Sequence, residues 1–266
     1  MPNIPDEYSN EDLVWLYDFE YIETYDIPLY IECARRFGTP VLELGAGTGR
    51  VSIPLAEAGF EVVGLEASPL LIDICRKKMA LSLKAQLPIS IVKADMAQFD
   101  LGKTYPSIII PINTFLILDH KGQQSCLECC RKHLVDGGTL VIDVFNPFGP
   151  SRKIAEINKT GGEQKLISTR PHPQTGLPVN RYVSQKVDMP NQLVYIDNVY
   201  EEQGEKSKRR WSFTEKLRFV YSSELEVMLN EAGLEIFRIL GWYDGRPFDQ
   251  SSEQMIFIAR AVFGLR

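Results

Sequence analysis

The stretch VLELGAGTGR, residues 41–50, decides the fold of this chain. Its first four residues predict a short buried β-strand, and Gly45, Gly47 and Gly49 predict a turn that leads into a helix. Glycine has no Cβ, so the backbone at these positions can pass close to a ligand. The Gly-x-Gly-x-x-Gly fingerprint of dinucleotide-binding proteins is not met, because Arg50 stands where the third glycine is required. The loop therefore does not predict NAD binding.

The composition of the 266 residues is that of an ordinary globular protein, with 44% hydrophobic and 24% charged side chains. The formal net charge of −6 and the pI near 5.3 argue against an extended nucleic-acid surface, which needs clustered Lys and Arg. The polar, acidic first residues are unlike a signal peptide, and no apolar run is long enough to cross a bilayer. We expect no nucleic acid and no membrane among the partners.

The five cysteines, an odd number, predict a reducing, cytoplasmic location rather than a disulfide framework. Cys126, Cys129 and Cys130 cluster within an expected helix. No second group of ligands stands near them in the sequence, so we interpret them as small buried hydrophobic residues. The three histidines are scattered, and we expect no metal site.

Strands and helices alternate from residue 40 to residue 145, which predicts a parallel sheet with helices on both faces. One or two helices, broken near Pro28, are expected before it. The buried run at 107–111 is typical of a parallel strand. Ser68 is the expected N-cap of the helix that ends near residue 83. The expected order is five βα units, with strands at 40–44, 60–65, 89–93, 107–111 and 139–145.

The second half of the chain has a different pattern. Turn residues and then alternating β-prone sequence predict three antiparallel strands, at 181–189, 192–202 and 207–221. A helix at 223–232 and two final strands, at 234–243 and 255–262, complete the chain. The basic run Lys206, Lys208, Arg209, Arg210 stands beside acidic residues, and we interpret it as a solvated hairpin tip rather than a nucleic-acid site.

This order and the motifs Glu43-x-Gly-x-Gly-x-Gly, Glu66 and Asp95 resemble the class I methyltransferases that depend on S-adenosylmethionine (SAM). The resemblance implies an α/β fold with a seven-stranded, doubly wound sheet, mostly parallel with a C-terminal antiparallel hairpin, plus an antiparallel β insertion. It divides the chain into an N-terminal helical lid (1–38), a SAM-binding core (39–146 and 222–266) and a substrate-covering insertion (147–221). The implied cofactor-binding residues are Glu43, Gly45, Ala46, Gly47, Gly49, Arg50, Glu66, Ala67, Asp95, Met96 and Asn113.

The chemistry of SAM matches these residue types. Glu66 follows the second strand, about twenty residues beyond the glycine loop, and a carboxylate there can accept hydrogen bonds from both ribose hydroxyls. In the family, the position of Glu43 orients the amino-acid end, that of Asp95 accepts from the adenine amine, and that of Met96 packs on the ring. Each acid could instead be a solvated turn or strand-end residue.

Two residues are candidates for the catalytic site. Tyr17 belongs to a Tyr-Asp pair that resembles the pair placed over the cofactor by small N- and O-methyltransferases. Alternatively, Tyr17 belongs to a stripe of aromatic residues that packs in the core. His120 follows the fourth strand, where an acid or base can act in related enzymes, although an isolated histidine is more often a surface residue. Asn113-Thr-Phe lacks the aromatic clamp that adenine-N6 methyltransferases use for a flipped base.

We therefore expect a SAM-dependent methyltransferase that acts on N or O of a small-molecule acceptor, with a homodimer left open. An RNA or protein methyltransferase remains an alternative, because it would use the same cofactor site. A non-catalytic SAM-fold module is the other alternative, but it would have no physical need for the intact set Glu43, Glu66 and Asp95.

Overall fold

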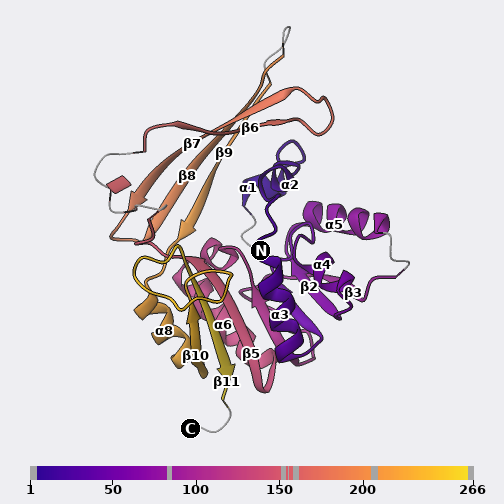
Figure 1. Ribbon diagram of the computed structural model, residues 1–266, viewed down its shortest axis with the longest axis vertical. Coiled ribbons are helices and arrows are strands. Elements are labelled where there is room, and N and C mark those ends of the chain that lie inside the picture. Colours follow the sequence, from indigo (N-terminus) through magenta and orange to yellow (C-terminus); the bar gives the residue numbers. More distant parts are fainter. Residues whose placement is uncertain are drawn as a thin grey trace.

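The computed structural model describes residues 5–82, 86–150, 154, 156–157, 162–204 and 209–262. Figure 1 shows a sheet with helices on both sides, and a second sheet that stands over one end of it. Short N-terminal helices lie between the two sheets. Lys206 and Lys208 of the basic run lie outside the described residues.

The main sheet has seven strands in the order β10-β11-β5-β4-β1-β2-β3. The strands β1 to β5 pair in parallel, and β11 is antiparallel to both of its neighbours, β5 and β10. This confirms the predicted mostly parallel sheet with a C-terminal antiparallel hairpin. The strands are β1 (Val41–Leu44), β2 (Val62–Glu66), β3 (Ile89–Lys93), β4 (Tyr105–Ile110), β5 (Leu134–Phe145), β10 (Leu234–Leu240) and β11 (Gln254–Ala261).

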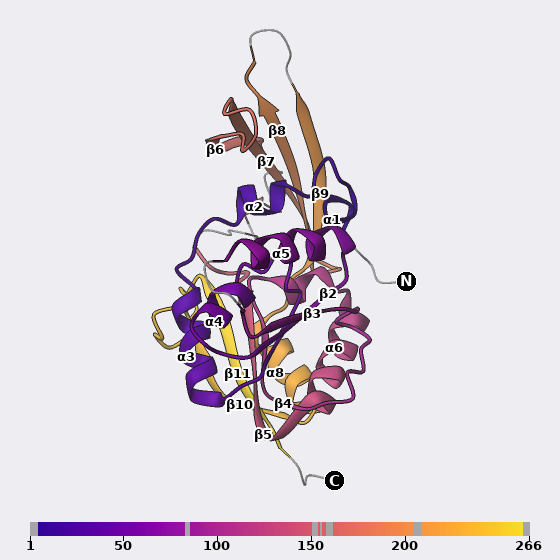
Figure 2. The same ribbon diagram turned by 90° about the vertical axis from the view of Figure 1, so that its right-hand side faces the viewer.

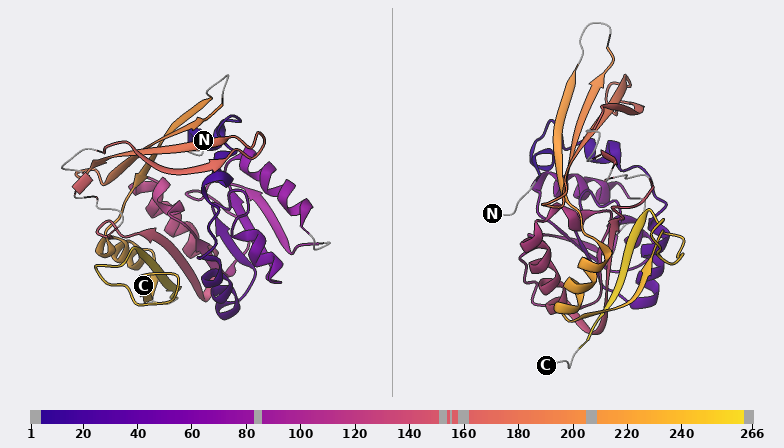
Figure 3. Two further views of the ribbon diagram at one scale, coloured as in Figure 1. Left: turned by 45° about the horizontal axis from the view of Figure 1, so that its top comes forward. Right: turned by 90° about the vertical axis from the view of Figure 1, so that its left-hand side faces the viewer.

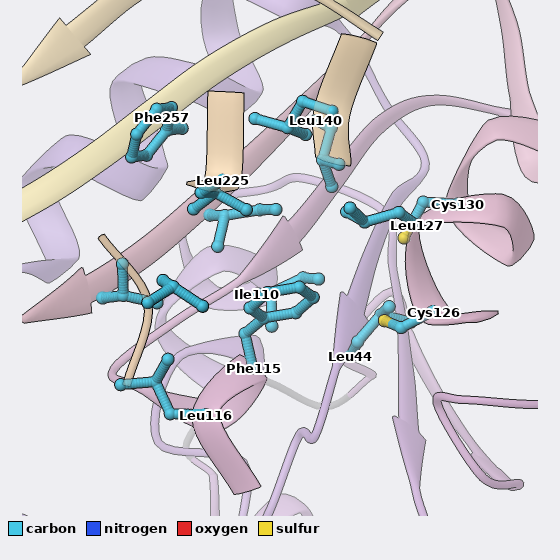
Figure 4. Packing of buried hydrophobic residues seen from close by; sticks show 14 of the residues in the cluster. Leu44, Ile110, Phe115, Leu116, Cys126, Leu127, Cys130, Leu140, Leu225 and Phe257 are labelled. Carbon is cyan, nitrogen blue, oxygen red and sulfur yellow. The ribbon is translucent and has the colours of Figure 1, made fainter. Parts of the chain in front are cut away.

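Helices cover both faces of this sheet (Figure 2). Because side chains alternate along a strand, β1 sends Val41 toward one face and Leu42 and Leu44 toward the other. Val41 packs with α3 and α4, whereas Leu44 belongs to the larger core with α6 and α8, where Figure 4 shows it near Cys126 and Ile110. The helices are α3 (Ile27–Phe37), α4 (Ser52–Glu57), α5 (Pro69–Leu81), α6 (His120–His133) and α8 (Ser222–Glu231), and a 3₁₀ turn, η1 (Thr114–Ile117), follows β4.

One detail of the predicted βα series differs. Residues 94–104, all of them described, carry the chain from β3 to β4 in turns and extended backbone, so one of the five expected βα units has no helix. The expected break near Pro28 lies just before α3, which begins at Ile27 and has Pro28 in its first turn, where no intrahelical N–H donor is needed. The predicted cap is present, since the Ser68 hydroxyl accepts from the Leu71 amide at 3.3 Å.

The insertion forms a four-stranded antiparallel sheet in the order β6-β7-β8-β9. Three of these strands were predicted, whereas β6 was not. Figure 3 shows the sheet projecting beyond the main sheet, with the N-terminal helices against it. The strands are β6 (Lys165–Pro171), β7 (Pro178–Asp188), β8 (Leu193–Glu202) and β9 (Arg210–Arg218).

The N-terminal residues divide into two parts, unlike the single lid expected for residues 1–38. The helix α3 packs into the core of the main sheet. The short helix α2 (Leu16–Glu20) instead shares a small apolar cluster with the insertion, in which Leu16 and Phe19 pack with Tyr200. The helix α1 (Asp6–Ser9) contacts α5. Only the part before α3 is therefore in a position to cover the end of the sheet.

The cysteines are buried or half-buried, and the described part of the chain holds no group of His, Cys, Asp and Glu that could bind a metal ion. Cys126 and Cys130 lie in the core between α6 and the sheet (Figure 4). Within the described residues, every helix is too short or too polar to traverse a bilayer.

Candidate functional site

A cavity of about 630 Å³ lies where the carboxyl ends of β1 to β4 face the insertion and the N-terminal helices. Its volume falls within the range of small-molecule sites, and the carboxyl edge of a parallel sheet is where open α/β folds bind ligands. The insertion contributes residues of β6 to β9 to its wall. Of the predicted site residues, those that line it are Tyr17, Glu43, Gly45, Gly47, Arg50, Glu66, Ala67, Asp95, Met96 and Asn113.

Two glycines of the loop after β1 have no room for a side chain. Gly45 and Gly47 have φ of +71° and +56°, in the left-handed region that favours glycine. A Cβ on Gly45 would lie 2.3 Å from Thr114 Cγ2, and one on Gly47 would lie 2.6 Å from the Tyr17 hydroxyl. The loop therefore presents bare main chain to the cavity.

Ala46 and Gly49 were predicted to bind the cofactor, but neither lines this cavity within the described chain. A Cβ on Gly49 would lie 2.7 Å from Cys75 Sγ, so its close approach is to α5 and not to a ligand. Ala46 is buried, and its methyl group faces Gly64 of β2. Both residues support the loop from behind.

Glu66 ends β2 and is bound to the glycine loop. One carboxylate oxygen accepts from the Gly47 amide at 2.9 Å, and the other accepts from the amides of Ala67 (2.9 Å) and Ser68 (2.8 Å). Burial raises the pKa of Glu66, and these three hydrogen bonds oppose the rise. Glu66 therefore organises the loop while it faces the cavity, a structural role that its sequence position did not reveal.

Asp95 and Met96 lie in the turn after β3, at one end of the cavity. The Asp95 carboxylate accepts from the Ala97 amide at 2.9 Å, which closes the turn through one oxygen, Oδ1. Met96 packs at the margin of the core. This places an acceptor and an adaptable apolar side chain next to each other at the edge of the sheet.

Glu43 is a buried carboxylate at the end of β1. The Ser52 hydroxyl donates to it. Burial raises the pKa of Glu43 to about 8, and the hydrogen bond from Ser52 and the charge of Arg50 oppose the rise. Because this pKa is close to physiological pH, Glu43 can gain or lose a proton when a charged ligand binds nearby.

Arg50 forms a nearly buried ion pair with Asp26, at the start of α3. Its Nη1 also donates to the Glu23 carbonyl oxygen at 2.6 Å. Its Nε is buried and has no hydrogen-bond partner in the described part of the chain. Arg50 also lines the cavity, so its guanidinium brings a positive charge to this wall.

The loop after β4 carries two residues with unusual backbone. Ile112 and Asn113 have φ of +47° and +61°. The side-chain oxygen of Asn113 accepts from the Phe145 amide at 2.7 Å, which binds the loop to β5. Strained backbone of this kind gathers at functional sites, where the surrounding structure must hold it.

Tyr17 lies over the glycine loop, as the contact with Gly47 shows. Tyr8 and Tyr21 adjoin it, with ring centroids 5.7 Å and 4.9 Å from that of Tyr17. Burial raises the pKa of all three phenols. These side chains are neutral at physiological pH, and they offer ring faces, donors and acceptors to the cavity.

His120, the other predicted catalytic residue, does not line the cavity in the described structure. Asp119 caps α6 by accepting from the Gly122 amide at 2.7 Å, and this directs His120 outward. The His120 side chain is 52% exposed, with Nδ1 3.7 Å from Glu224 Oε1. His120 therefore lies beside Glu224 and outside the cavity lining.

The sequence predicts that the insertion covers the substrate, but it does not identify which residues of the insertion line the cavity. Glu20 of α2 forms an ion pair with Arg181 of β7, and Asn198 of β8 donates to Glu215 of β9 at 3.1 Å. Glu20, Arg181 and Glu215 line the cavity. Alternation along the insertion strands could have identified one inward face, but not which of the two faces meets the cavity.

The cavity is strongly acidic. Among the described lining residues, nine are carboxylates and three are basic. Two of the basic side chains, Arg50 and Arg181, are paired with Asp26 and Glu20. The site therefore favours a cationic ligand.

Comparisons with known proteins agree with this site. Residues 41–138 match the family described as "Methyltransferase domain". The chain is 27% identical over 226 residues to the cypemycin N-terminal methyltransferase of a Streptomyces species. The aligned region covers 83% of this chain and 82% of that protein. The CcbJ methyltransferase from Streptomyces caelestis is 30% identical, with a TM-score of 0.77 over 90% of this chain and 97% of that chain.

The structure of SAM-bound CalS10, an amino pentose methyltransferase from Micromonospora echinaspora, has the same fold. Its TM-score is 0.70 at 20% identity, over 93% of this chain and 97% of that chain. The protein belongs to the class I SAM-dependent methyltransferases. Its cofactor is SAM, a net cation, which fits the acidic cavity and the bare glycine loop.

Proposed function

We propose that this methyltransferase acts on the nitrogen of a small-molecule amine. The observation that carries the proposal is the excess of carboxylates in the cavity, which extends beyond the cofactor motifs to Glu7, Glu20 and Glu215. An aliphatic amine reaches the site as an ammonium ion, and these groups favour its binding. The ammonium ion must release one proton before its nitrogen lone pair can attack the methyl group, and a lining carboxylate would accept that proton. The name of the cypemycin relative, an N-terminal methyltransferase, supports nitrogen as the acceptor atom.

The order of strands supports one orientation of SAM. Asp95 and Met96 follow β3, Glu66 ends β2, and the glycine loop follows β1, so adenine, ribose and methionine would lie along the sheet edge in that order. The Asp95 carboxylate would accept from the adenine amine, and Glu66 would accept from the ribose hydroxyls. The guanidinium of Arg50 would attract the methionine carboxylate.

The chemistry needs alignment more than acid–base catalysis. The methyl group of a sulfonium is already activated, so the protein must hold the acceptor nitrogen in line with the methyl and the sulfur. Orientation of this kind contributes up to about 7–11 kcal/mol in favourable cases. An alcohol acceptor holds its proton far more tightly than an ammonium ion and would need a stronger base than a carboxylate, and in the described chain no histidine lines the cavity.

The roles of the covering elements follow from this arrangement. Tyr17 would close the cavity over the cofactor, while β7 and β9 would bind the rest of the acceptor through Arg181 and Glu215. We propose that residues before α3 act as the lid and that the insertion selects the acceptor.

The test is methyl transfer from isotopically labelled SAM across a panel of acceptors. We expect transfer to aliphatic amines, including amino sugars and peptide N-termini, and none to phenols or carboxylates. Glu215→Gln should raise KM for the preferred amine at least fivefold with unchanged SAM affinity. Glu201→Gln, on the same sheet but outside the cavity lining, is the matched control. Transfer to a phenol or carboxylate in preference to every amine would refute the proposal.

A further inference from the structure

Asp143 of β5 is a fully buried carboxylate that binds three separate elements. Its Oδ2 accepts from the Tyr243 hydroxyl at 2.7 Å, from the Tyr30 hydroxyl at 2.9 Å and from the Ile112 amide at 3.2 Å. Tyr30 belongs to α3, Tyr243 follows β10, and Ile112 follows β4. One oxygen atom therefore connects a helix and two loops to the centre of the sheet.

The loop after β4 depends on the same residue. The main-chain oxygen of Asp143 accepts a hydrogen bond from the Asn113 amide at 2.9 Å. The Asp143 side chain binds the amide of the preceding residue, Ile112. Both loop residues have positive φ, and a β-branched residue such as Ile112 rarely adopts that conformation. Hydrogen bonds from these two amides to Asp143 thus hold two consecutive strained residues in place.

Asp143 itself does not line the cavity, but Ile112, Asn113 and Tyr243 do. The strand order places β4 and β5 on the far side of β1 from Glu66 and Asp95. This wall therefore faces the part of the cavity opposite the adenine end, where the methionine and the acceptor would meet. A carboxylate is costly to bury, so an ordinary core position in β5 would favour an apolar residue.

We infer that Asp143 is a positioning residue that holds Ile112, Asn113 and Tyr243 as one rigid wall around the methionine end of SAM. The orientation of SAM on which this rests is that of the proposed function. Asp143 touches neither reactant. It acts through the three residues that face the cavity.

The test compares two ligands that differ only at the methionine end. S-adenosylhomocysteine carries the amino-acid part, whereas 5′-methylthioadenosine lacks it. Asp143→Asn should weaken binding of S-adenosylhomocysteine about tenfold and of 5′-methylthioadenosine less than twofold, measured by calorimetry. Tyr243→Phe, which removes one donor and keeps the carboxylate, should show the same selectivity at two- to threefold. The control is Thr139→Val, a buried polar position four residues before Asp143 in β5, which should change neither affinity.

Equal weakening of both ligands, or no change in either, would overturn the inference. A double-mutant cycle gives a second test. The double variant Asp143→Asn/Tyr243→Phe should bind S-adenosylhomocysteine no more weakly than Asp143→Asn alone. If the affinity losses of the two single variants multiply, the two residues do not act as one wall. Neither binding measurement requires a methyl acceptor. If wild type methylates no amine, the proposed function fails, whereas these affinities still decide the role of Asp143.

Discussion

The hydroxyl of Tyr17 lies so close to Gly47 that a single Cβ on the glycine would come within 2.6 Å of it. The loop that receives the cofactor and the helix that covers it are therefore in direct contact. α2 is also held from the other side, because Lys78 Nζ lies 2.6 Å from Asp18 Oδ1 and the Thr48 hydroxyl donates to the same oxygen at 2.6 Å. The position of Tyr17 is thus determined by residues on the glycine loop and on α5.

Gly47→Ala should weaken SAM binding at least tenfold. The new methyl group displaces Tyr17 and also forces a left-handed backbone on alanine, which costs about 1–2 kcal/mol. Gly102→Ala separates these causes, because Gly102 has a similar φ of +60° and open space around it. It should lose a similar amount of stability and bind SAM normally. Calorimetry and denaturant unfolding measure both quantities, and equal SAM affinities for the two variants would contradict the steric argument.

Glu66→Ala should weaken both cofactor binding and the fold, whereas Asp95→Ala should weaken binding alone. Glu66 accepts hydrogen bonds from three main-chain amides that are buried or partly buried. The substitution leaves these donors unpaired, and each unpaired buried donor costs about 1–3 kcal/mol. Asp95 accepts from the Ala97 amide in a partly exposed turn. Affinity for S-adenosylhomocysteine should fall about 10- to 100-fold in each variant. Unfolding of the ligand-free proteins should distinguish them, and identical stabilities would refute the difference in role.

The sequence was sufficient to predict the cofactor half of this protein, because local spacing carries that information. A glycine loop, an acid at the next strand end and an Asp one strand later lie along one edge whenever the strands are parallel. β6 was missed for the converse reason. Its side chains are largely exposed, so its sequence has no apolar alternation to reveal a strand.

The contacts around Asp143 could not be predicted, since its tyrosine partners are 113 and 100 residues away along the chain. The position of His120 shows a different limit of the sequence. Its distance from β4 in the sequence suggested the cavity, but direction at a helix start depends on the cap, and Asp119 turns His120 toward Glu224. Proximity along the chain does not fix where a side chain points.

His120→Ala should lower the methyl-transfer rate less than about tenfold, below the 10²- to 10⁴-fold that a general base contributes. Tyr17→Ala should lower it by about 10²-fold, because a small displacement in an oriented reaction is costly. Single-turnover rates at saturating SAM separate chemistry from cofactor affinity. A loss above about 10³-fold for His120→Ala would show that His120 reaches the reacting atoms after a rearrangement.

The buried carboxylate of Glu43 should make stability depend on pH. Its pKa rises from 4.5 to about 8 on folding because burial disfavours the charged form. Between these two values the folded protein retains a proton that the unfolded chain has released. The free energy of unfolding should therefore fall as pH rises from about 4.5 to 8, by at most about 1.4 kcal/mol per pH unit from this group, and level off above 8.

Glu43→Gln keeps a hydrogen-bonding side chain next to Ser52 but cannot ionise. The difference in unfolding free energy between wild type and Glu43→Gln should shift against the wild type as pH increases from 5 to 8, measured by denaturant unfolding at four pH values. Contributions from other buried acids, such as Asp143, cancel in this difference. Glu235→Gln, at an exposed position of β10, should instead track the wild type. Parallel curves for wild type and Glu43→Gln would mean that Glu43 ionises in the folded protein as readily as in the unfolded chain.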